Sequence, residues 1–108
     1  MDVEKLKYTA SVNSTIEEVW SIIEENHRRS VIILDDQKVV GTVSDGDLRK
    51  TMLAKRLLST PISEVMNVNY TVIRDEEREK AQELFLKKDI FLIPVVDTNL
   101  CLIDIILR

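Results

Sequence analysis

The residues best suited to chemistry in this sequence are Ser44 and Asp47, which flank Gly46 where a helix is expected to begin. Their spacing is that of a capping box, in which two side chains accept hydrogen bonds from backbone amides at the helix start. Free N–H groups at such a start also suit a phosphate, and a glycine there admits a ligand close to the backbone. The segment therefore predicts either a helix cap alone or a cap that also touches a ligand.

A strand over residues 39–43 must position this pair, because that run is apolar and rich in β-branched residues. The next helix is expected to carry Leu48, Met52 and Leu53 on one side. Upstream, Ser14 and Glu17 stand at capping-box spacing before a helix with an apolar stripe. That stripe consists of Ile16, Val19, Trp20, Ile22 and Ile23. Other expected elements are strands at 6–12, 31–34, 70–73, 91–96 and 100–106, a short helical segment at 61–66, and a helix capped by Asp75.

The second half of the chain repeats the plan of the first. Four positions recur at an offset of 62 residues, namely Val19 with Ala81, Ile22 with Leu84, Ile23 with Phe85 and Asp35 with Asp97. With a following turn that is two residues shorter, Cys101 takes the place of Gly41, Asp104 that of Ser44 and Leu107 that of Asp47. Because neither half would easily bury its apolar face alone, we expect two αββα-like halves that share one core.

Composition excludes several classes of protein. At 44% hydrophobic and 31% charged residues, the chain is neither disordered nor membrane-spanning. The first residues lack a secretion signal and Cys101 is the only cysteine, so we expect a cytoplasmic protein in a reducing compartment. A formal net charge of -4 argues against nucleic-acid binding. Nucleophile, zinc and Walker patterns are missing, which predicts no enzyme, no metal and no required cofactor.

Three segments make the chain similar to a tandem pair of CBS domains, the arrangement called a Bateman module. They are residues 40–48 (VGTVSDGDL), 61–66 (PISEVM) and 93–97 (IPVVD). The resemblance covers essentially the whole chain and implies an α/β (α+β) fold of two repeats, each roughly β-α-β-β-α. These repeats would span residues 1–60 and 61–108 and pack sheet to sheet with pseudo-twofold symmetry, the last helix being cut short.

Members of this family mostly bind adenosine nucleotides, or relatives such as S-adenosylmethionine, in their clefts. By resemblance, Ser44 would contact the phosphate or ribose, and Asp47 would accept hydrogen bonds from the ribose hydroxyls. The physics agrees, since a carboxylate accepts well from a vicinal diol. The remaining nucleotide-binding positions that the resemblance implies are Thr42, Gly46, Arg28, Val31 and Val12.

The family often places a basic phosphate contact just before the second strand, which points to His27, Arg28 or Arg29. Cations at the end of a helix are also explained as solvated residues that favour the helix dipole. The sequence leaves both interpretations of these residues open.

The second half departs from the family motif. On the alignment above, Asp104 would repel a phosphate and Leu107 would not hold a ribose, so we expect at most one competent site, in the first half. The segment 44–49 (SDGDLR) is similar to those of CBS pairs joined to sugar-phosphate nucleotidyltransferases and to sugar-phosphate isomerases. The segment 102–107 lacks the usual glycine and favours the nucleotidyltransferase kind. Because the sequence stops at Arg108, we expect a longer protein with a catalytic domain downstream.

Two functions stay open on these observations. The first is a regulatory sensor, in which AMP, ADP or ATP in the first-half site shifts the packing of the halves and alters an attached catalytic domain. The second is a ligand-free structural module that joins a larger enzyme into a homodimer. Its contacts would come from exposed apolar residues on the helices carrying Met52 and Leu53, or Leu84 and Leu86.

Overall fold

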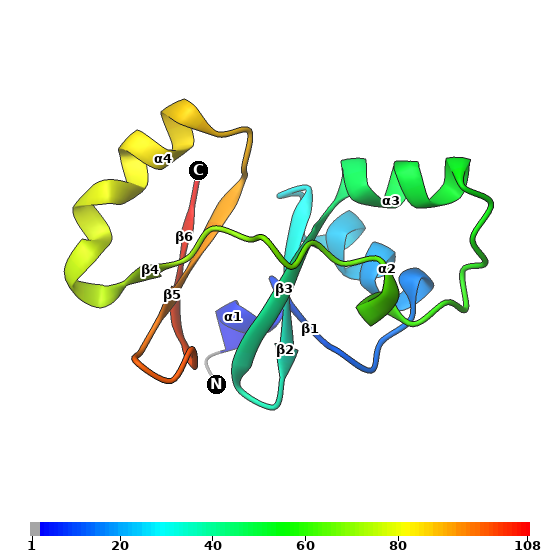
Figure 1. Ribbon diagram of the computed structural model, residues 1–108, viewed down its shortest axis with the longest axis horizontal. Coiled ribbons are helices and arrows are strands. Elements are labelled where there is room, and N and C mark those ends of the chain that lie inside the picture. The colour runs from blue at the N-terminus through cyan, green and yellow to red at the C-terminus, as the bar shows by residue number, and fades with distance from the viewer. Residues whose placement is uncertain (1–2) are drawn as a thin grey trace.

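The computed structural model describes residues 3–108 and has two three-stranded sheets packed face to face, with helices outside each sheet (Figure 1). The first half contains α1 (Val3–Leu6), β1 (Thr9–Ser11), α2 (Ile16–Asn26), β2 (Ser30–Asp35), β3 (Lys38–Ser44) and α3 (Asp45–Leu53). The second half contains the 3-10 helix η1 (Ile62–Glu64), β4 (Ile73–Arg74), the 3-10 helix η2 (Asp75–Lys80), α4 (Ala81–Lys87), β5 (Leu92–Val96) and β6 (Leu102–Leu107). Within residues 3–108, none of the helices combines the length and apolar character that a membrane span requires.

The two halves share one strand topology, which confirms the predicted repeat. The sheet orders are β1-β2-β3 and β4-β5-β6, and in each sheet the first pair of strands is parallel and the second antiparallel. Each hairpin also has a bulge, after Ile33 in the first and after Val95 in the second. These bulges stand 62 residues apart, at the offset that the helix stripes predict.

Apolar side chains fill three layers of the molecule. Between the sheets, both halves contribute the buried residues Ile32, Leu34, Val39, Leu92, Val96 and Leu102. Val31 and Ile33 alternate with these along β2, so they point the other way and pack with α2 and with Leu48 of α3. A smaller cluster that includes Ile93 and Val95 lies beneath α4. The predicted packing of sheet on sheet is therefore confirmed.

The register of the second hairpin differs from the predicted one. Equivalent residues pair with equivalent partners on the preceding strand, namely Ser44 with Ser30 and Leu107 with Leu92, and Gly41 with Ile33 and Asp104 with Val95. Leu107 therefore takes the place of Ser44, and Asp104 takes that of Gly41. The predicted alignment, which matched Cys101 to Gly41 and Asp104 to Ser44, is wrong.

A longer turn between β5 and β6 explains the difference in register. Two residues separate β2 from β3. In the second hairpin, the Asp97 amide donates to the Cys101 carbonyl over 3.0 Å, which leaves a loop of three residues. Leu100, the last of these, has a φ of 67°, the left-handed conformation that ends a common three-residue hairpin loop. The position equivalent to Asp47 consequently lies beyond the printed sequence and not at Leu107.

Helix α2 has its N-cap one residue later than predicted. Thr15 is the N-cap, and its hydroxyl accepts from the Glu18 amide over 3.3 Å. The Glu18 carboxylate accepts from the Thr15 amide over 3.1 Å, which completes a capping box. Ser14 belongs to a preceding turn, where its amide donates to the Ser11 carbonyl. The predicted box of Ser14 and Glu17 is therefore wrong.

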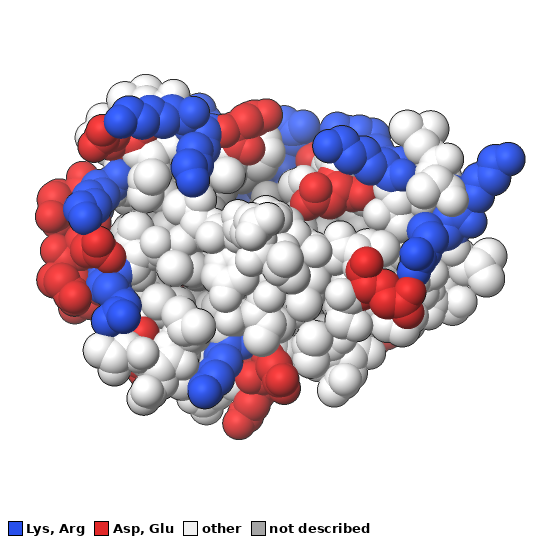
Figure 2. All heavy atoms as spheres, viewed as in Figure 1, with Lys and Arg blue, Asp and Glu red and all other residues white. Residues whose placement is uncertain are grey.

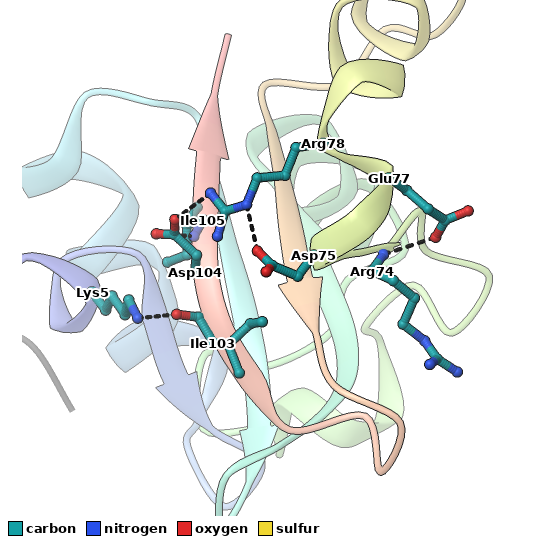
Figure 3. A network of polar contacts seen from close by, with 8 residues as sticks. All are labelled: Lys5, Arg74, Asp75, Glu77, Arg78, Ile103, Asp104 and Ile105. Atoms are coloured by element: carbon teal, nitrogen blue, oxygen red, sulfur yellow. Dashed lines mark hydrogen bonds and ion pairs between the residues drawn. The ribbon is translucent and has the colours of Figure 1, made fainter.

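Asp75 opens η2 without capping it (Figure 3). Its carboxylate accepts from Arg78 Nε over 2.6 Å, and Arg78 Nη1 reaches Oδ2 of Asp104 on β6 over 2.7 Å. The amide that needs a partner at this helix start is that of Arg74, and it donates to Glu77 over 2.8 Å. The predicted Asp75 cap is wrong because that carboxylate forms an ion pair with the next turn of the helix.

β1 and β4, the first strands of their sheets, are shorter than predicted. β1 covers only three residues of the predicted strand 6–12, and Leu6 belongs to α1. In α1, the Lys5 ammonium donates to the Ile103 carbonyl of β6 (Figure 3). β4 begins at Ile73, and the preceding Tyr70 donates its hydroxyl to a carbonyl of β3 over 2.9 Å. Both segments are held by contacts with the opposite half, which sequence patterns of one strand do not reveal.

The linker between the halves crosses β3 on its way to β4 (Figure 1). Its residues Asn67, Asn69, Tyr70 and Thr71 line the same cleft as Ser44. The Thr42 amide donates to the Asn67 carbonyl over 3.0 Å, and the Asn67 amide donates to the Thr42 carbonyl over 2.8 Å. Gly41 permits this approach, because a Cβ there would lie 2.7 Å from Met66 Sδ. The linker thus becomes part of the surface beside the Ser44 cap.

Candidate functional site

Ser44 ends β3 and caps α3, as the sequence spacing predicts. The Asp47 amide donates to Ser44 Oγ over 3.1 Å, and the Ser44 amide donates to Asp47 Oδ2 over 3.0 Å. This reciprocal pair starts the helix because it gives partners to amides that lack them at a helix end. An ionised carboxylate has about four acceptor positions. Asp47 therefore keeps acceptor capacity for a further donor.

A cleft of about 290 Å³ opens between the two halves beside this cap. Its first wall comes from the first half and consists of Ser30, Thr42, Val43, Ser44 and Asp47. Its second wall comes from the linker and the second half and consists of Asn67, Asn69, Tyr70, Thr71, Lys88, Asp89, Ile90, Phe91 and Leu92. Small-molecule pockets span roughly 300–1,000 Å³, so this cleft suits a compact ligand.

Lys88 supplies the positive charge of the cleft lining. Its Nζ donates to Thr71 Oγ1 over 3.0 Å, which joins the end of α4 to the segment before β4. Two carboxylates, Asp47 and Asp89, also line the cleft, and Phe91 adds an aromatic surface. The arrangement offers acceptors for hydroxyl groups, one cation for an anionic group, and an apolar surface for a planar ring.

Asp45 forms ion pairs with two guanidinium groups near the start of α3. Its Oδ2 is 2.9 Å from Arg29 Nε and 3.4 Å from Arg49 Nη1. Partial burial acts to raise the pKa of Asp45, but the hydrogen bond and charge of Arg29, the Gly46 amide and the charge of Arg49 together lower it below its usual value. Asp45 is therefore an ionised anchor for both arginines.

Three of the predicted site residues, Thr42, Ser44 and Asp47, line this cleft, and four do not, namely Gly46, Arg28, Val31 and Val12. Val31 is fully buried in the cluster beneath α2, and Val12 packs against that cluster. Arg28 Nη1 lies 3.5 Å from the carbonyl of Arg108. A Cβ on Gly46 would meet only Arg49 and Ser44, each at 3.6 Å.

The sequence does not predict the second wall directly, because the residues expected to flank the cap all belong to the first half. On the 62-residue offset, Ile90 and Phe91 are the counterparts of Arg28 and Arg29. In the pseudo-twofold arrangement, the cap of the first half faces the loop before β5 of the second half. The flanking residues of a cap thus come from the other repeat. The offset itself was the signal that would have located them.

A known family model matches the first half of the chain. Residues 4–54 match the family model of the CBS domain. Over this stretch the chain is therefore similar to a CBS domain. Strand β3 and the Ser44 cap both lie within the matched residues, so the resemblance drawn from segment 40–48 is confirmed for this half.

Solved structures extend the CBS fold over both halves. A CBS domain protein from Pyrobaculum aerophilum complexed with AMP has a TM-score of 0.77 and 20% identity, covering 93% of this chain and 79% of that one. CBSX2 in complex with AMP has a TM-score of 0.77 and 24% identity, covering 95% of this chain and 83% of that one. At these identities the likeness establishes the fold, which is the predicted α+β arrangement.

Curated relatives correct the predicted catalytic neighbour of the CBS domain. Arabinose 5-phosphate isomerase GutQ of Escherichia coli O6:H1 is 39% identical over 71 residues, covering 64% of this chain and 22% of the relative. The GutQ of Salmonella typhi is 41% identical with the same coverage. The chain spans about a fifth of the length of these relatives. They are isomerases, so the preference for a nucleotidyltransferase, which rested on the missing glycine in segment 102–107, is not supported.

Proposed function

We propose that this chain is a regulatory CBS module that binds an adenosine nucleotide (AMP, ADP or ATP) in its cleft and controls a catalytic domain joined to it. The observation that carries the proposal is the convergence of the Ser44 and Asp47 cap with Thr71 and Lys88 on one cleft. The two AMP complexes among the solved structures with the same fold support the class of ligand.

Each part of the cleft would have a distinct role in nucleotide binding. The free acceptor positions of Asp47 would receive the ribose hydroxyls, which are paired donors that suit a carboxylate. Lys88 and the amides at the start of α3 would face the phosphate. Thr42 and the apolar surface near Phe91 would flank the base. The chain itself would contribute no catalytic group.

The catalytic domain would be a sugar-phosphate isomerase of the kind represented by the GutQ relatives. The halves, with a boundary between residues 60 and 61, would change their packing when the nucleotide binds. Such coupling requires different affinities for two arrangements and typically amounts to roughly 1–3 kcal/mol.

A thermal-shift titration with AMP, ADP and ATP tests this proposal. A ligand at 100 times its dissociation constant adds about 2.7 kcal/mol of stability, so a clear rise in Tm is expected for the parent chain. Asp47→Ala should lose that rise. Thr15→Ala is the matched control, because it removes the α2 cap, which is not part of the cleft, and should keep the rise. No shift with any nucleotide would contradict the proposal.

A second candidate function, dimerisation without a ligand, is favoured by exposed apolar side chains. Leu53 is 83% exposed and Leu86 is 80% exposed, whereas Met52 and Leu84 are half-buried. The face in Figure 2 also has a broad uncharged centre with charged side chains around its edge. Sedimentation equilibrium would test this function. We expect a dimer in the parent and a monomer in Leu53→Glu or Leu86→Glu. A monomeric parent at high concentration would exclude dimerisation as the function.

A further inference from the structure

Arg29 joins the two walls of the cleft without lining it. Its Nε donates to Asp45 Oδ2 over 2.9 Å, and its Cζ lies 4.6 Å from the centre of the Phe91 ring. Asp45 is the first residue of α3, directly after the Ser44 cap, and Phe91 belongs to the second wall. One guanidinium group therefore contacts both halves at the edge of the cleft.

The backbone of Arg29 is held in an uncommon conformation. Its φ is 62°, in the left-handed region that few residues other than glycine adopt. The Arg29 carbonyl accepts from the Asp45 amide over 2.9 Å, and its side chain pairs with the carboxylate of the same residue. Such backbone strain persists only where the surroundings determine it, and it clusters at functional sites.

Arg29 and Phe91 are equivalent residues of the two repeats. Each directly precedes the residue that opens the central strand of its sheet, Ser30 in β2 and Leu92 in β5. A contact between equivalent positions lies at the pseudo-twofold axis that relates the halves, as a self-pairing residue does in a twofold dimer. A substitution at this contact should consequently change how the two halves are positioned relative to each other.

We propose that Arg29 is a positioning residue that sets the width of the cleft. It does so through a double contact, here called the clasp, in which its guanidinium bonds to Asp45 of the first half and stacks on Phe91 of the second. The proposal rests on the proposed nucleotide binding, since it concerns the same cleft. Arginine suits this task because its planar guanidinium bonds a carboxylate along its edge and stacks on an aromatic ring with its face. Lysine has a compact ammonium group and does not reproduce that geometry.

Arg49 provides a matched control for this clasp. It also pairs with Asp45, at 3.4 Å, but the guanidinium over the Phe91 ring is that of Arg29. Replacing Arg29 leaves the Asp45 carboxylate with the Arg49 cation, so the start of α3 should stay folded. Replacing Arg49 removes a comparable surface charge and leaves the link between the halves intact.

The first test measures AMP binding by calorimetry in the parent, Arg29→Ala, Arg29→Lys and Arg49→Ala. We expect Arg29→Ala to weaken AMP binding about tenfold, within the range of coupling between contacting residues. Arg29→Lys should recover little of that loss, and Arg49→Ala should bind like the parent. AMP binding by Arg29→Ala within twofold of the parent overturns the clasp and leaves the proposed function standing. Full recovery by Arg29→Lys overturns the need for stacking on Phe91.

The second test needs no nucleotide and stays decisive if the parent binds none. Spin labels at Lys50→Cys on α3 and Gln82→Cys on α4, in a Cys101→Ser background, report the distance between the halves. We expect a broader distance distribution in Arg29→Ala than in the parent, and an unchanged one in Arg49→Ala. An unchanged distribution in Arg29→Ala overturns the clasp, whereas failure of AMP binding in the parent counts against the proposed function alone.

Discussion

Leu107 of β6 occupies the place in the second hairpin that Ser44 of β3 occupies in the first. Each residue lies opposite the first residue of the preceding antiparallel strand. The Ser44 hydroxyl accepts a hydrogen bond that starts α3, and the side chain of a leucine has no acceptor. The pseudo-twofold partner of the candidate site thus lacks the polar cap on which the site is built.

This difference predicts one nucleotide per chain. Calorimetric titration of the parent with AMP should give a stoichiometry near one site, because Leu107 offers neither a hydrogen bond to the phosphate nor a cap to a helix. The same titration of Ser44→Leu, which puts the second-half residue at the first-half position, is the complementary measurement. It should abolish binding, and two equal sites in the parent would contradict the prediction.

The Ser44 cap also predicts a loss of stability. Ser44→Ala should lower the free energy of unfolding by about 1 kcal/mol, since it leaves the Asp47 amide without its side-chain acceptor. Thr15→Ala removes the equivalent bond at the start of α2 and should cost a similar amount. Urea unfolding of both variants checks this. A Ser44→Ala loss near zero would mean that the cap contributes little to α3.

The two glycines predict opposite results when each is replaced by alanine. At Gly41, a Cβ would lie 2.7 Å from Met66 Sδ and 3.1 Å from the Asn67 carbonyl. Gly41→Ala should therefore destabilise the chain by about 1–3 kcal/mol, as overpacking does. At Gly46 the nearest atoms are 3.6 Å away, and alanine is the better helix former. Gly46→Ala should be neutral or stabilising by up to about 1 kcal/mol, and thermal unfolding would compare the two.

Local patterns were enough to predict the Ser44 and Asp47 cap in the first wall of the cleft. The strand over residues 39–43 and the pairing of Ser44 with Asp47 depend only on side-chain type and on a spacing of three residues. The repeat and its packing were also readable, because the apolar stripes recur at a fixed offset. The strands predicted at residues 31–34 and 91–96 are accordingly found as β2 and β5.

Other features depend on contacts that a single segment does not encode. Leu100 takes a left-handed conformation and adds a residue to the second turn, so counting along the chain misplaced every later residue of β6. Lys88 and Thr71 reach the cleft only because the halves are related by a pseudo-twofold axis. Asp75 has a good capping residue type, but Arg78 engages its carboxylate. The boundary between residues 60 and 61 stays a prediction.

Lys88 predicts discrimination between adenosine and AMP. As the cation of the cleft lining, it should contribute to the binding of the phosphate but not of the nucleoside. Lys88→Ala should weaken AMP binding by about tenfold to a hundredfold, as expected when a charge-assisted contact of roughly 1.5–3 kcal/mol is lost. Adenosine binding should change little. Equal losses for both ligands would indicate that Lys88 shapes the cleft and does not meet the phosphate.

Asp104 predicts a loss of stability in acid. The Arg78 guanidinium, 2.7 Å away, outweighs partial burial and lowers the pKa of Asp104 from its ordinary 3.8 (Figure 3). Because the folded pKa lies below the unfolded one, the unfolded chain binds more protons between the two values. The stabilisation is thus present above about pH 4 and disappears as the pH falls through the folded pKa.

Asp104→Asn keeps the shape of the side chain and removes this dependence. At about pH 7 the variant should be less stable than the parent by up to roughly 1 kcal/mol, since the pair is partly exposed. The difference should shrink on acidification, and 1 M salt should reduce it at neutral pH because screening weakens the ion pair. Urea unfolding at a series of pH values measures it. A difference that stays constant between about pH 2 and 7 would show that Asp104 acts through packing and not through its charge.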